Sequence, residues 1–316
     1  MKIKRRHVYA GIALIIIAFA LLYLGSYKIN PKKDVTKNQE DKISWKVDKN
    51  GYLSYPLNRS GILFNRQNYG ETESLTISKV IYQSRNGNIY GLLVLPKSAA
   101  ELLPGIILLP GAGVSKESEL KLAEKIAELD AAVLVIDQRG VGETGGKLPR
   151  IAEDYSNFLK SQEPYQHLMV YDALRAYDML YSAPFVDPER IIIAGESLGG
   201  RIAVIAAAID RNIKGVLVIS SSGLDFEKTN DTKVNEFLQS IDSDHYIDQI
   251  TPRKIVMMHN VNDMIVPLGS AINSFQKAQE PKQFIQINET SCNHGYCDSM
   301  YNGLVESLDY LVDIRH

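Results

Sequence analysis

The hydrophobic and polar positions of the chain follow two periods that alternate along most of its length. Short apolar runs at 105–109, 131–136 and 190–194 are typical of strands buried on both faces. Between them, apolar residues recur every three or four positions in 116–129 and 165–181, as in amphipathic helices. This alternation predicts an α/β fold with a mostly parallel central sheet of about eight strands and helices on both faces.

Further elements extend this pattern. The stretches 75–83 and 89–95 flank an Asn-Gly turn, which predicts an antiparallel hairpin at one edge of the sheet. Residues 43–70 contain no clear pattern. Additional strands are expected at 214–219, 254–258 and 283–287, and additional helices at 198–209 and about 299–311.

The amino end differs from the rest of the chain. A basic leader, MKIKRRH, precedes an uncharged apolar stretch at 8–27, and a helix of about 20 residues matches the hydrocarbon core of a bilayer. We therefore expect a leader and transmembrane helix at 1–27, a polar linker at 28–42 and one globular domain at 43–316. An uncleaved anchor is favoured over a cleaved signal peptide, which would give a secreted form, because no small-residue cleavage site follows the long apolar run. The leading basic cluster favours an extracytoplasmic domain.

Composition narrows the classes of protein. A chain of 316 residues that is 45% hydrophobic and 23% charged can bury a large core and is not a disordered protein. Its two cysteines are too few for a disulfide scaffold. The formal net charge of −2 argues against a nucleic-acid partner. The oligomeric state is left open.

The sharpest motif is Gly195-Glu196-Ser197-Leu198-Gly199, which follows an expected strand and opens an expected helix. A serine on such a tight turn projects from the sheet, and the small residues around it allow the backbones to approach closely. This context predicts that Ser197 is a nucleophile. The alternative is a turn of small residues that serves only helix–strand packing.

A serine hydroxyl needs a base and an orienting acid. His294 follows the last expected strand and is the favoured base, with His259 as its rival. Asp263 follows the strand at 254–258 and is the favoured acid, because a carboxylate there would hold the imidazole in the correct tautomer. The alternatives to this acid are Asp248 and Asp298, which are more simply read as surface residues.

The order Ser197, Asp263, His294 is that of the α/β-hydrolase superfamily. Between about residues 75 and 311 the chain resembles this superfamily, closest to its dienelactone-hydrolase and acyl-peptidase-like serine esterase branches. The segments that carry the resemblance are 133–146, 186–200, 261–267 and 293–296. In such enzymes the segment equivalent to 136–140 shapes the entrance of the site, which implies structural roles for Asp137 and Arg139.

The resemblance also implies an oxyanion hole. One donor is expected to be the backbone N–H of Leu198, and the other to come from the loop after 105–109. We expect this second donor to be Ala112. Gly113 stays an alternative, because this loop reads Pro-Gly where relatives often have His-Gly. The alternative is that this loop is an ordinary strand-to-helix glycine turn with no oxyanion hole. Neither a cofactor nor a metal is implied.

Two cysteines flank the expected base as Cys292-x-His294-x-x-Cys297. They are free thiols, a disulfide that closes a short loop, or, with His294, metal ligands. A metal site is the least favoured, because a fourth ligand is missing and the histidine already has a use. The other two readings stay open.

Together these features predict a membrane-anchored serine hydrolase that cleaves carboxylic esters or thioesters through an acyl-enzyme. Its partners would be a small ester or peptide-like substrate and, through the amino-terminal helix, membrane lipid. A peptidase of the acyl-peptidase type is the first alternative, and a non-catalytic binding protein on the same fold is the second. Segments 141–164 and 221–253 are expected to form a small cap that sets substrate size.

Overall fold

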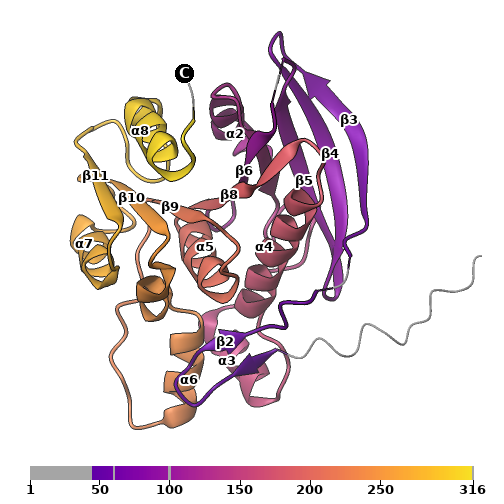
Figure 1. Cartoon of the computed structure of the whole chain (residues 1–316). Helices are drawn as coiled ribbons and strands as arrows, with labels where there is room; N and C mark the ends of the chain where they lie inside the picture. The colour runs from indigo at the N-terminus through magenta and orange to yellow at the C-terminus, as the bar shows by residue number, and fades with distance from the viewer. Residues whose placement is uncertain (1–44, 60, 99–100, 315–316) are drawn as a thin grey trace, which may run out of the picture. The chain divides into compact units, whose positions relative to one another are not determined.

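The computed structural model describes residues 45–59, 61–98 and 101–314, and this part belongs to one compact unit that begins at Trp45 (Figure 1). The expected transmembrane helix and the whole of the expected linker lie outside the described residues. Within the described part, no helix combines the length and the apolar character that crossing a bilayer requires.

A nine-stranded sheet forms the centre of this unit, in the order β11-β10-β9-β8-β6-β7-β5-β4-β3. The six strands from β11 to β7 are parallel to one another, whereas β5, β4 and β3 are antiparallel to their neighbours. The strands are β3 (Phe64–Glu71), β4 (Leu75–Ser84), β5 (Gly87–Pro96), β6 (Leu103–Leu109), β7 (Ala132–Ile136), β8 (Val186–Glu196), β9 (Gly215–Ile219), β10 (Lys254–Asn260) and β11 (Lys282–Ile287). The mostly parallel sheet is confirmed, and β3 is the strand that the pattern did not predict.

Helices cover both faces of the sheet, as expected (Figure 1). Helices α2 and α8 share one hydrophobic core with alternate residues of the strands, such as Ile106 and Leu108 of β6. Helices α4, α5 and α7 pack on the opposite face. The helices are α2 (Leu120–Ala127), α3 (Ile151–Leu159), α4 (Tyr165–Tyr181), α5 (Leu198–Ile209), α6 (Thr232–Ser240), α7 (Leu268–Lys277) and α8 (Tyr301–Val312), with 3₁₀ turns η2 (Ser243–His245), η3 (Ile247–Ile250) and η4 (Asp298–Met300).

The segment that had no clear pattern contains a separate small sheet. Strands β1 (Lys46–Val47) and β2 (Leu53–Ser54) pair antiparallel beside α6, and Tyr246 donates a hydrogen bond to Gly51 while accepting one from Leu53. Helices α3 and α6 contact each other and come from the two segments expected to form a cap. The carboxyl ends of β8, β10 and β11 lie at one edge of the sheet, because these strands are parallel.

Candidate active site

Ser197 lies on the sharp turn between β8 and α5. Its φ is +49° and its ψ is −116°, a conformation that a residue with a side chain rarely adopts. The turn is fixed at both ends, because the Ser197 N–H donates to the Ile219 carbonyl and its own carbonyl accepts from the Ser221 hydroxyl and the Arg201 N–H. The backbone therefore presents this hydroxyl at the carboxyl edge of the sheet.

Close backbone approach explains why this turn needs glycine. A Cβ on Gly199 would lie 2.0 Å from the Leu109 carbonyl oxygen, so no side chain fits there. A Cβ on Gly195 would lie 2.3 Å from the Gly199 carbonyl oxygen. The glycines of the motif thus bring α5 against β6 and β8, as its sequence context predicted.

Asp263 and His294 meet at the same edge, although 31 residues separate them. Asp263 follows β10, and its side chain is buried, whereas His294 follows β11 and is partly exposed. The Nδ1 atom of His294 lies 2.9 Å from both carboxylate oxygens of Asp263. The backbone N–H groups of Ile265 and Val266 donate to Oδ1 of the same carboxylate, at 2.9 and 2.8 Å. Asp263 is therefore held in place and is aimed at the imidazole.

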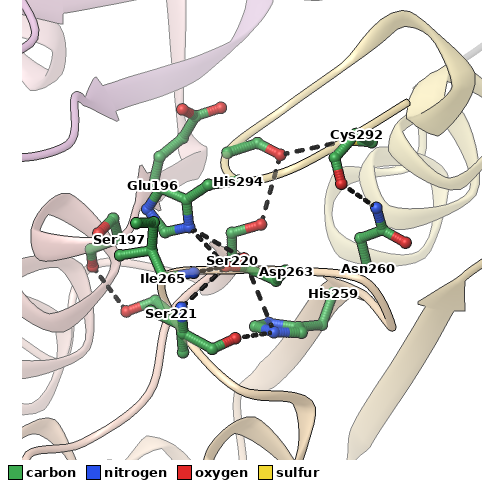
Figure 2. A network of polar contacts seen from close by, with 12 residues as sticks. Glu196, Ser197, Ser220, Ser221, His259, Asn260, Asp263, Ile265, Cys292 and His294 are labelled. Carbon is green, nitrogen blue, oxygen red and sulfur yellow. Dashed lines mark hydrogen bonds and ion pairs between the residues drawn. The ribbon is translucent and has the colours of Figure 1, made fainter. Parts of the chain in front are cut away.

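Direct contacts bring the His294 loop against the serine turn. The Tyr296 N–H donates to Oε1 of Glu196 at 2.8 Å, and the Ser220 hydroxyl donates to the Gly295 carbonyl at 3.3 Å. Figure 2 draws Ser197, Asp263 and His294 within one network of polar contacts. Among the residues that the structure describes, no hydrogen bond joins the Ser197 hydroxyl to His294.

The alternative bases and acids have other partners. His259 is buried, donates from Nε2 to the Val266 carbonyl at 2.9 Å and lies 3.8 Å from Asp263. It therefore stabilises the loop that carries Asp263. Asp298 pairs with Lys121 at 2.7 Å on the surface. Asp248 is an exposed residue of η3. Geometry thus favours Asp263 and His294 over these alternatives, and their catalytic roles stay predictions.

A cavity of about 370 Å³ opens beside Ser197. Its lining includes both residues expected to form the oxyanion hole, Leu198 and Ala112. Gly113, the alternative donor, is not among the lining residues and has a φ of +77°. The two segments expected to form a cap also contribute lining, through 148–151 and 221–223.

Asp137 and Arg139 make the structural contacts that the resemblance implied. The buried Asp137 accepts from the buried Lys116 ammonium at 2.8 Å and from the Glu143 N–H at 2.9 Å. Arg139 pairs with Asp172 at 2.7 Å. These ion pairs hold the loop after β7 against neighbouring elements, and neither of them involves Ser197.

Glu119 and Glu196 form a buried carboxyl pair that sequence reasoning missed. Burial and the neighbouring Glu196 carboxylate raise the pKa of Glu119 to about 9. Burial also raises the pKa of Glu196. Two neighbouring negative charges in a buried site repel each other and are poorly solvated. The pair therefore shares one proton, and Glu119 is neutral. The position of Glu196 inside the serine motif was the available signal, but its distant partner left no trace in the sequence.

The two cysteines form a disulfide between positions 292 and 297. The bridge closes the loop that carries His294. Of the three readings left open by the sequence, the structure selects this one. Sulfurs bonded to each other are not thiolates, so the Cys-His-Cys metal site is excluded by this pairing.

Comparisons with known proteins agree with the predicted superfamily. The chain matches the family model "Acetyl xylan esterase (AXE1)" over residues 62–281, a span that includes Ser197 and Asp263 and ends before His294. Among solved structures, an acetyl xylan esterase from Paenibacillus sp. R4 superposes with a TM-score of 0.65 at 21% identity. That match covers 79% of this chain and 88% of the other, which confirms the α/β-hydrolase fold.

Curated relatives match shorter parts of the chain. The chain is 25% identical to an uncharacterized protein, YfhR of Escherichia coli O157:H7, over 49% of its length, and 31% identical to a putative hydrolase, YtaP of Bacillus subtilis (strain 168), over 43%. These matches span 60% and 40% of the two relatives. Because the family model covers well over half of the residues, the chain belongs to the acetyl xylan esterase (AXE1) family.

Proposed function

We propose that the chain is a serine hydrolase that cleaves carboxylic esters through an acyl-enzyme. The observation that carries the proposal is the contact of His294 Nδ1 with both oxygens of Asp263, 2.9 Å away, on a loop that contacts the Ser197 turn. In this arrangement Nε2 is the ring nitrogen left for the serine proton. Membership of an esterase family supports the ester as the bond that is cleaved.

The reaction assigns one task to each group. As the Ser197 hydroxyl oxygen bonds to the ester carbonyl carbon, His294 takes its proton, and Asp263 stabilises the imidazolium. The amides of Leu198 and Ala112 donate to the oxyanion. When the tetrahedral intermediate collapses, the C–O bond to the alcohol breaks and His294 returns the proton to the leaving oxygen. Water then attacks the acyl-serine by the same steps in reverse, which releases the acid.

Short acyl groups fit the proposal best, and the acetyl esters named in the family description are the first candidates. The cavity beside Ser197 has a volume at the lower end of the range for ligand pockets. Its lining by 148–151 and 221–223 supports the hypothesis that these segments limit the size of the substrate. Thioesters remain within the same chemistry.

We also propose that residues 8–27 anchor the enzyme in a membrane with the hydrolase domain on the outside. The disulfide between Cys292 and Cys297 supports an oxidising location for this domain. Membrane fractions of cells that express the full chain should retain it after an alkaline carbonate wash. Release into the supernatant would contradict anchoring and would leave the hydrolase proposal intact.

The hydrolase proposal is tested with a fluorophosphonate probe and short 4-nitrophenyl esters on the full chain in detergent. The probe should label the wild type but not Ser197→Ala, and the variant should lose ester hydrolysis by several orders of magnitude. Ser115→Ala, which changes a serine in the loop before α2, should label like the wild type. Absence of labelling in the wild type would favour a binding protein. Faster cleavage of aminoacyl amides than of esters would favour a peptidase.

A further inference from the structure

The cavity beside Ser197 contains an arginine without a counter-ion. Arg201 belongs to the first turn of α5 and lines this cavity with Ser197, Leu198 and Ser221. Its side chain makes no hydrogen bond or salt bridge to any residue that the structure describes. A positive charge therefore faces the proposed reaction centre with its donors unused.

This placement is unfavourable in the free protein. The first turn is the positive end of the helix dipole, where a cation is repelled. Burial lowers the pKa of Arg201, and only the attraction of Asp242 opposes it. One oxygen of Asp242, Oδ1, already accepts from the N–H groups of Leu224 and Asp244 at 2.9 and 3.1 Å, and no salt bridge joins Asp242 to Arg201 in the described part of the chain. An anion that entered the cavity would relieve these costs.

Other buried or half-buried arginines of the fold have partners in the protein itself. Arg59 pairs with Asp178 at 2.7 Å and also with Asp210, and Arg139 pairs with Asp172. Arg253 donates to several backbone carbonyls, including that of Ala207 at 2.7 Å. Each of these arginines thus has at least one protein acceptor for its guanidinium, and Arg201 differs from them in the described part of the chain.

A second polar atom in the same cavity lacks a partner. Gln166, from the first turn of α4, lines the cavity, and its Oε1 atom is buried with no hydrogen-bond donor in the described part of the chain. Buried polar atoms are normally satisfied, so each exception points to a missing group. The Arg201 guanidinium needs an acceptor and Gln166 Oε1 needs a donor, so a ligand that satisfied both side chains would carry both kinds of group.

We propose that Arg201 binds a carboxylate of the substrate, so that the preferred substrates are esters with a negative charge a few atoms from the scissile bond. This inference rests on the proposed hydrolase function and names the substrate class of the same site. Guanidinium and carboxylate form paired, charge-assisted hydrogen bonds, which are stronger in a partly buried site than in water. The carboxylate belongs to either the acid or the alcohol part of the ester.

Two matched pairs of esters test the inference and distinguish these sources. Monoethyl succinate carries the charge on the acid part and is compared with ethyl pentanoate, while 4-acetoxybenzoate carries it on the alcohol part and is compared with its methyl ester. The readout is the ratio of kcat/KM for the charged ester to that for the neutral one. In at least one pair the wild type should favour the charged ester, and succinate should competitively inhibit hydrolysis of neutral esters.

The variant Arg201→Met removes the charge and keeps the length of the side chain. It should lower the ratio for the preferred pair about tenfold to hundredfold, as expected for the loss of hydrogen bonds to a charged group. Arg201→Lys should restore part of the ratio. Arg190→Met is the matched control, because Arg190 is not among the residues that line the cavity and pairs with Asp187 at 2.8 Å; its ratio should stay within about twofold of the wild type.

Three results would overturn the inference. The first is a wild type that prefers neutral esters in both pairs. The second is an Arg201→Met ratio equal to that of the wild type. The third is an equal loss on charged and neutral esters together with a lower unfolding temperature, which indicates a structural role. In each case hydrolysis by the wild type and its labelling by the fluorophosphonate leave the proposed function intact, whereas absence of both would remove that function as well.

Discussion

The turn that carries Ser197 and the loop that carries His294 are positioned by different means. The serine turn has a short sequence signature, because its φ of +49° and its glycines, which pack against Leu109 and within the motif, all belong to five consecutive residues. The histidine loop contains no regular structure before η4 and is fixed by contacts from distant elements. Asp263 holds the imidazole, Glu196 accepts from Tyr296, and a disulfide closes the loop. The serine turn can therefore be recognised from a short motif, whereas the position of the histidine loop depends on long-range packing.

Breaking the contact between Asp263 and the imidazole should have the largest effect. We expect Asp263→Asn to lower kcat by about 10⁴-fold, because an amide no longer stabilises the imidazolium and favours the wrong tautomer. One oxygen remains to accept from Ile265 and Val266, so the unfolding temperature should change little. Steady-state kinetics and thermal unfolding measure the two quantities. A loss below tenfold would mean that another acid serves His294.

The serine turn should be destabilised most by a substitution that prevents the close approach of its backbone to β6. Gly199→Ala places a methyl group 2.0 Å from the Leu109 carbonyl oxygen, so α5 must move away from β6. We expect the free energy of unfolding to fall by about 3 kcal/mol or more, measured in denaturant.

Gly269→Ala is the matched control for this prediction. Gly269 lies in α7, where an added Cβ would have no neighbour within 4 Å. The substitution should be neutral or stabilising by up to about 1 kcal/mol, because alanine is the better helix former. Equal destabilisation by both substitutions would contradict the packing argument for the turn.

The difference between the two regions also explains which parts the sequence could predict. Helices α4 and α5 occur at the predicted residues, because their apolar periodicity reflects burial against the sheet. Strand β3 was missed because seven of its eight residues are exposed and leave no alternation to detect. Helices α6 and α7 were missed as well: each has two buried residues, too few to mark a periodic apolar face.

The residues of the site also divide into those that a local sequence pattern indicates and those that only a spatial neighbour makes important. Ser197, Asp263 and His294 could be proposed because each lies in the segment that follows a recognisable strand. Glu119 and Arg201 could not be, because their significance depends on what lies beside them in space. A carboxylate on the surface and a carboxylate paired with another one look alike in a sequence. Long-range contacts of this kind require coordinates.

Opening the disulfide should loosen the histidine loop while leaving the serine turn intact. We expect the double variant Cys292→Ser/Cys297→Ser to lose about 2 kcal/mol of unfolding free energy, the loop-closure entropy of a short bridge. Its kcat should fall about tenfold, because His294 samples more positions. Labelling of Ser197 and esterase activity are measured with and without a thiol reductant. The chain has two cysteines, so the reductant should lower the activity of the wild type and leave the double variant unchanged. An equal effect on both would locate the sensitivity outside this bridge.

The carboxyl pair beneath the histidine loop should make stability depend on pH. The pKa of Glu119 is raised to about 9 from a usual value of 4.5, so the folded state holds a proton that the unfolded chain releases. The stabilising effect of this proton is complete below pH 4.5 and is lost as the pH rises through 9. Glu119→Gln keeps a neutral side chain at every pH. Relative to the wild type, its unfolding free energy should therefore improve as the pH rises between 5 and 9, on the order of 1 kcal/mol per pH unit.

The control for this pH dependence is Glu153→Gln. Glu153 lies on the surface of α3, and its hydrogen bond from Arg150 lowers its pKa. This group is ionised in both the folded and the unfolded state above pH 5, so its substitution should shift stability by a constant amount across the range. Denaturant unfolding at several pH values measures both differences. If Glu119→Gln also gave a constant difference, Glu119 and Glu196 would not share a proton in the folded protein.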